Sequence, residues 1–81
     1  MTDDEFADKF FQLAIACNFM ITSRNNIECP HGKNLSKEKL KAIHQLLGSQ
    51  CPKATSNELK NSGIQPCCFT IFRQIAQLIY P

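Results

Sequence analysis

Apolar residues recur along this 81-residue chain with the spacing of amphipathic α-helices. Near the start, Phe6, Phe10 and Leu13 follow one another at intervals of four and three residues, which places them on one face of a helix. The C-terminal stretch is apolar over more than half of its helical circumference, and no segment alternates with the period of a strand. The pattern predicts an all-α fold, a small four-helix bundle with helices at about 3–21, 37–47, 56–62 and 66–79 and one long loop at 22–35.

Residues with helix-capping chemistry mark where three of these helices begin. Thr2 with Glu5 has the spacing of a capping box, in which the hydroxyl accepts from a backbone amide and the carboxylate reaches back to the cap. Thr55 with Glu58 repeats this spacing, and Ser36 is a further N-cap candidate. The caps therefore agree with the helix starts that the apolar periodicity indicates.

Length and composition indicate one helical domain spanning residues 1–81. A chain of this size with 43% apolar residues can form a core, although it buries only a modest share of its surface. The acidic start, with Asp3, Asp4 and Glu5, lacks the basic segment of a signal peptide, and no apolar run reaches the length of a membrane span. We therefore expect a cytoplasmic protein whose five cysteines are free thiols.

The predicted first helix carries a second apolar stripe. Phe11, Ile15 and Phe19 are spaced by four residues and lie nearly opposite the stripe that contains Phe6 and Phe10. Three remaining helices, one of them short, can hardly enclose a helix on two sides. Either the 22–35 loop folds over the second stripe, or the stripe binds a protein partner or a second copy of the chain. We predict the latter, a small non-enzymatic binding or regulatory protein with Phe11, Ile15 and Phe19 as its protein-binding residues.

A second interpretation is DNA binding through residues 55–78. In TSNELKNSGIQPCCFTIFRQIAQL, a first helix stops at Gly63, Ile64 follows the turn, and Phe69 lies where a second helix would pack. This segment resembles the helix-turn-helix pattern of small bacterial and phage regulators. The resemblance implies that the last helix enters the DNA major groove. It implies base contacts from Gln65, Thr70, Arg73 and Gln74. The last helix carries only one charge, so phosphate contacts would come from lysines of the preceding helices, Lys37, Lys41 and Lys60.

Cysteine and histidine residues beside turn-forming residues are candidate zinc ligands. Cys29 and His31 belong to a Cys-Pro-His-Gly stretch, and Cys51 precedes a proline. Zinc prefers four such soft ligands in a tetrahedron, and its binding adds folding energy to a small domain. No Cys-x-x-Cys pair is present, and the adjacent Cys67 and Cys68 would point different ways on a helix. A third prediction is thus a zinc-stabilised domain with Cys29, His31 and Cys51 as ligands.

No catalytic arrangement is recognisable in the sequence. Cys29 lies near His31, but no third group that would orient this histidine as a base is apparent. There is no Gly-rich phosphate loop, and so short a chain has little room for a ligand-sized pocket. His44 falls on the predicted solvent side of the second helix. We therefore expect a protein that is not an enzyme and has no cofactor apart from the zinc considered above.

Overall fold

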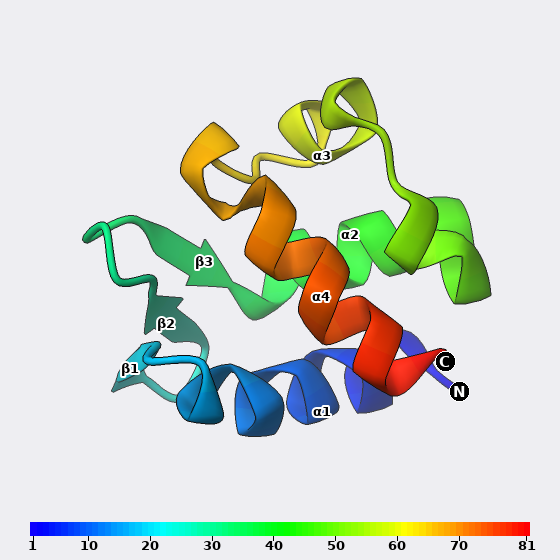
Figure 1. Ribbon diagram of the computed structural model, residues 1–81. Coiled ribbons are helices and arrows are strands. Elements are labelled where there is room, and N and C mark those ends of the chain that lie inside the picture. Colours follow the sequence, from blue (N-terminus) through cyan, green and yellow to red (C-terminus); the bar gives the residue numbers. More distant parts are fainter.

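The computed structural model describes residues 1–81 and combines four α-helices with a small antiparallel sheet (Figure 1). The predicted all-α four-helix bundle is therefore wrong, because a sheet occupies the segment expected to hold a helix end and a long loop. Two short 3₁₀-helices, η1 and η2, precede α3 and α4. The elements are α1 (Asp3–Ala16), β1 (Met20–Ser23), β2 (Asn26–Glu28), β3 (Asn34–Ser36), α2 (Lys37–Leu47), η1 (Gly48–Lys53), α3 (Ser56–Asn61), η2 (Pro66–Cys68) and α4 (Phe69–Ile79).

Three of the four helices lie close to their predicted positions. The Ser36 hydroxyl caps α2, which begins at the next residue. Thr55 and Glu58 form both hydrogen bonds of the capping box at the start of α3, as their spacing predicted. α4 begins at Phe69 rather than at residue 66, because Pro66 starts a 3₁₀ turn ahead of it. Local capping signals thus located these helices well.

The first helix ends at Ala16, well before the predicted residue 21, because the chain turns at Asn18. Asn18 adopts a left-handed conformation with φ of 67°, which asparagine tolerates better than most residues. The Phe19 N–H donates to the Ala14 carbonyl at 3.1 Å, and the Asn18 N–H donates to the Ile15 carbonyl at 3.2 Å. These two bonds form the Schellman motif that commonly ends helices. The chain after Asn18 is therefore free to enter β1.

The sheet has the order β1-β2-β3, with both neighbouring pairs antiparallel. Ile21 pairs with Ile27, and Ile27 pairs with Leu35, so these three side chains form one row on the same face of the sheet. Ile27 and Leu35 are buried, whereas Ile21 stands on the outer strand and is exposed. The strands contain only three or four residues, which is too few for their alternation to be recognised in the sequence.

The core forms where α1 packs against both α2 and α4 (Figure 1). The rings of Phe10 from α1 and Phe72 from α4 have centroids 5.3 Å apart, and Leu40 and Ile43 of α2 are fully buried beside them. The two chain termini lie side by side, away from the sheet (Figure 1). None of the helices combines the length and apolarity needed to cross a lipid bilayer.

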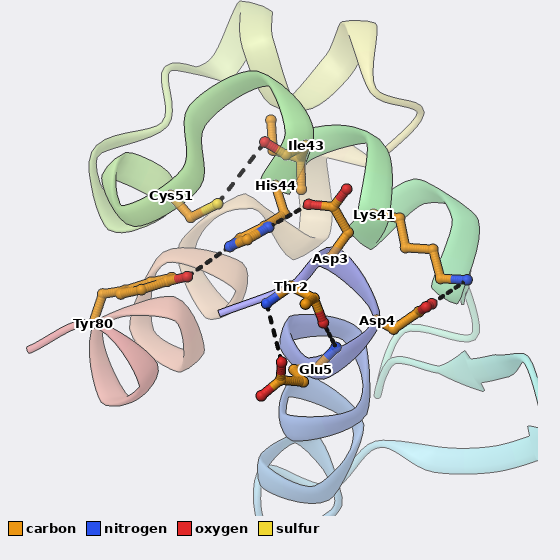
Figure 2. Close-up of polar contacts among 9 residues, drawn as sticks. All are labelled: Thr2, Asp3, Asp4, Glu5, Lys41, Ile43, His44, Cys51 and Tyr80. Carbon is orange, nitrogen blue, oxygen red and sulfur yellow. Dashed lines mark hydrogen bonds and ion pairs between the residues drawn. The ribbon is translucent and has the colours of Figure 1, made fainter.

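A partly buried hydrogen-bond network joins these two termini to α2 (Figure 2). The His44 ring lies 2.6 Å from Asp3 Oδ1 through Nδ1, and 2.6 Å from the Tyr80 hydroxyl through Nε2. The same ring stacks on Phe6 with centroids 4.6 Å apart. His44 is only 6% exposed, so its predicted place on the solvent side is wrong. Partners for both ring nitrogens come from distant parts of the chain, and they make this burial tolerable.

Candidate functional site

The fold buries two of the three residues of the predicted interaction stripe on α1 and leaves the third exposed. Phe11 and Phe19 are 7% and 5% exposed and belong to the same core cluster as Ile27 of the sheet. Lys37 Nζ also lies 5.3 Å from the centre of the Phe11 ring. The expectation that these phenylalanines form an exposed surface is therefore corrected. The chain turns back after α1, and the segment that follows covers these two phenylalanines, as in the other alternative, while Ile15 stays exposed.

Large apolar side chains remain exposed at the end of α1 and in β1, where Met20 and Ile21 are consecutive and therefore lie on opposite faces of the sheet. Ile15, Met20 and Ile21 are 51%, 66% and 53% exposed. We call these three residues the β1 edge surface. β1 is an outer strand of the sheet, and all four of its residues are exposed. An outer strand also presents a row of backbone N–H and C=O groups without a sheet partner. Sequence analysis identified Ile15 but continued the first helix to residue 21, through Met20 and Ile21.

The three expected zinc ligands do not come together. Cys51 is fully buried in η1, where its thiol donates to the Ile43 carbonyl at 3.9 Å (Figure 2). Burial, together with the negative charge of Asp3, raises the pKa of Cys51 to about 12. His31 is exposed on the turn that follows Cys29, and it is not among the residues whose ligand atoms cluster with the Cys29 sulfur. The ligand set of Cys29, His31 and Cys51 is therefore corrected.

Cys29 instead meets Cys67 and Cys68. The three sulfur atoms lie within 4.8 Å of one another, and those of Cys67 and Cys68 are 3.8 Å apart. Sequence analysis placed the adjacent pair in a regular helix, where the side chains would diverge. In the structure they end the 3₁₀ turn η2 that Pro66 begins. Proline just before two cysteines is the signal that could have indicated this turn.

The β2–β3 turn holds Cys29 at the cluster. The Cys29 N–H donates to the Lys33 carbonyl at 2.9 Å, and the Gly32 N–H donates to the Cys29 carbonyl at 2.8 Å. Gly32 has φ of +80°, a conformation that glycine adopts without steric cost. This tight turn fixes the position of the Cys29 backbone between two strands. The sequence Cys-Pro-His-Gly therefore forms a tight turn at the cluster.

The surroundings of the cluster shift the pKa values of Cys29 and Cys68 in opposite directions. Desolvation by burial raises the pKa of Cys29, but hydrogen bonds from the backbone amides of Lys33 and His31 and from the neighbouring thiols outweigh it. The pKa of Cys29 consequently lies below its usual value. Desolvation raises the pKa of Cys68, and its contacts with the sulfurs of Cys29 and Cys67 raise it further. Cys29 therefore ionises before Cys68.

The proposed DNA-reading residues differ in their availability. Arg73 donates from Nε to the Ala54 carbonyl at 2.7 Å and from Nη2 to the Ser56 hydroxyl at 3.2 Å. These bonds tie the α4 side chain to the start of α3. The other proposed readers are exposed, and they are Gln65, Thr70 and Gln74.

The lysines proposed to contact phosphate are also partly engaged within the chain. Lys37 Nζ lies 2.6 Å from Asp8, and Lys41 Nζ lies 2.6 Å from Asp4. Lys60 is exposed. Because α1 carboxylates neutralise two of the three lysines, this face offers less positive charge to a phosphate backbone than the sequence suggests.

Comparisons with protein-family models, with curated proteins and with solved structures gave no significant match. Two surface hollows are present, both lined mainly by polar side chains, and neither includes the cysteine cluster. The cysteine cluster and the β1 edge surface are therefore the two features whose geometry suggests a function.

Proposed function

We propose that this protein is a small non-enzymatic binding module of the cytoplasm, which captures an extended segment of a partner protein along strand β1. The exposed outer strand carries this proposal, because all four β1 residues are exposed and two of them are large and apolar. Extended peptides add to such edges through main-chain hydrogen bonds, while alternate side chains supply specificity. The five free cysteines suit the reducing conditions of that compartment.

The apolar row across the sheet supports an added strand. Leu35, Ile27 and Ile21 lie in register on one face, and only Ile21 is left exposed. Neighbouring side chains on one face of a sheet contact each other across strands. A fourth strand beside β1 would therefore place an apolar residue against Ile21 and cover it, as Ile27 is covered now.

The small size of the surface favours an extended segment over a globular partner. Three exposed side chains cannot supply the roughly 800 Å² per partner that a stable interface between folded proteins buries. Strand addition needs less side-chain area, because backbone hydrogen bonds contribute to affinity. The bulge between Ile21 and Ser23 shortens the regular part of the edge, so a short segment centred on Ile21 fits best. We expect apolar residues at every second position of the bound segment.

Selection from a random linear peptide library, followed by calorimetry and amide hydrogen exchange, tests this proposal. We expect selected peptides to have alternating apolar residues and to slow exchange of the β1 amides. Ile21→Lys should weaken their binding by about tenfold or more, because a lysine at an edge opposes strand pairing. Leu46→Lys is the matched control, since Leu46 is 60% exposed on α2 and should leave binding unchanged.

Two results would contradict the proposal. Selected peptides whose binding is insensitive to Ile21→Lys, or that leave β1 exchange unchanged, would remove β1 as the binding site. A concentration-dependent dimer, seen by sedimentation equilibrium and lost in Ile21→Lys, would assign the edge to a second copy of the chain instead.

A further inference from the structure

The cysteine cluster joins two parts of the chain that have few other polar links. Cys29 comes from the β2–β3 turn, and Cys67 and Cys68 come from η2, directly before α4. Apart from contacts among the thiols, no hydrogen bond or ion pair connects the turn at 29–33 to residues 66–69. The sulfur atoms are therefore the polar groups that meet at this junction.

The spacing of the sulfur atoms fits a tetrahedral metal. Zinc–thiolate bonds of about 2.3 Å in a tetrahedron hold sulfur atoms about 3.8 Å apart. The sulfurs of Cys67 and Cys68 already have a separation of 3.8 Å, and the Cys29 sulfur lies within 4.8 Å of both. A shift of about 1 Å or less in Cys29 would complete the geometry. We propose that Cys29, Cys67 and Cys68 bind one zinc ion as three thiolates, with water in the fourth position.

The chemistry of the cluster and its backbone surroundings favour zinc. Thiolate sulfur is a soft ligand, which excludes Mg²⁺ and Ca²⁺ and selects zinc among the abundant divalent ions. The Cys29 N–H donates to the Lys33 carbonyl and the Gly32 N–H donates to the Cys29 carbonyl, and these backbone bonds orient Cys29 at the cluster, as the outer contacts of a metal ligand do. On binding, three S–H bonds break and three Zn–S bonds form, and the three protons pass to solvent without any electron transfer.

The site would act as a clamp between the sheet and α4. Zinc would close the segment from Cys29 to Cys67, and structural zinc contributes directly to the folding energy of small domains. Of the three ligands, Cys67 is exposed to solvent, whereas Cys29 and Cys68 are buried. The metal would therefore enter from the Cys67 side, where water can also reach the fourth position. This inference is independent of partner binding at β1.

The test uses the full chain, purified without chelator and kept under a metal-free reductant. We expect one zinc per chain by elemental analysis, and cobalt substituted for zinc should show thiolate charge-transfer absorption and the visible bands of a tetrahedral ion. Cys67→Ser should abolish stoichiometric binding without unfolding the chain, since Cys67 is exposed. Cys29→Ser should also abolish stoichiometric binding. Cys17→Ser is the control and should bind as the original protein does, because Cys17 lies outside the cluster.

Far-ultraviolet circular dichroism of each variant separates loss of metal from loss of fold. Zinc well below one per chain, or full binding in Cys67→Ser, would overturn the proposal. A disulfide between any two of the three cysteines in freshly purified protein would overturn it as well. His31→Ala is expected to keep the metal, and loss of zinc in that variant would replace the proposed water by His31.

Discussion

His44 Nδ1 lies 2.6 Å from Asp3 Oδ1, and this contact fastens the start of α1 to the buried side of α2. The Tyr80 hydroxyl lies 2.6 Å from the other ring nitrogen, Nε2, and forms a hydrogen bond with it (Figure 2). A single imidazole thus connects the first helix, the second helix and the C-terminal end. Because the ring is buried, each of its nitrogens depends on these partners for hydrogen bonding.

Removal of one partner should destabilise the fold. Asp3→Ala leaves the buried Nδ1 without its partner, and we expect a loss of about 1–3 kcal/mol in the free energy of unfolding, measured by urea denaturation. Asp4→Ala is the matched control. It removes the same charge from the same helical turn, but Asp4 pairs with Lys41 at the surface, where ion pairs contribute little. Equal losses in the two variants would contradict a specific role for the Asp3–His44 contact.

The two phenylalanines of the second α1 stripe should behave as core residues. Phe11→Ala and Phe19→Ala should each cost about 3–5 kcal/mol, because each leaves a cavity in a packed core. Ile15 lies on the same stripe but is 51% exposed, so Ile15→Ala should change the free energy of unfolding by only about 0.5 kcal/mol. Thermal denaturation followed by circular dichroism measures all three. A melting curve for Phe11→Ala that matches the unchanged chain would mean that this face of α1 is not buried.

The end of α1 can be tested at Asn18. Asn18→Gly should keep or slightly raise stability, since glycine adopts the left-handed conformation freely. Asn18→Val should cost about 1–2 kcal/mol, because a β-branched residue is strained there. The opposite order is expected if residues 17–21 continue the helix, since glycine is the poorer helix former. Urea denaturation of the two variants therefore distinguishes a helix end from a continuous helix.

Alkaline pH should weaken the fold through Cys51. Its pKa is about 12 in the folded chain, against 9.0 for an unperturbed thiol, because desolvation disfavours the thiolate. Above pH 9 the unfolded chain loses this proton first, so stability should be complete below pH 9 and decline as the pH rises towards 12. Urea denaturation at a series of pH values should show a shallower decline for Cys51→Ala. The remaining decline would come from Tyr80, whose pKa burial also raises.

Parallel stability–pH curves for Cys51→Ala and the unchanged chain would contradict this assignment. A constant offset between the curves is expected in any case, because the smaller side chain leaves a cavity at every pH. The change in slope above pH 9 is therefore the informative quantity.

The sequence by itself determined the parts of the fold that depend on near neighbours. The capping residues Thr2, Ser36 and Thr55 all form the caps that their spacing predicts. The apolar periodicity located α2, and the position of α4 came within a turn of its prediction. Each of these signals acts within one or two helical turns, so it can be read locally.

The tertiary structure decided the sheet, the buried stripe and the cysteine cluster. Strands of three or four residues have too little alternation to be recognised, and Asn18 could have stayed helical without the packing that follows it. Burial of Phe11 depends on the returning segment after α1, and the meeting of Cys29 with Cys67 depends on residues far apart in the chain. Such contacts are established only when distant segments pack together, because local spacing carries no information about which segments will meet.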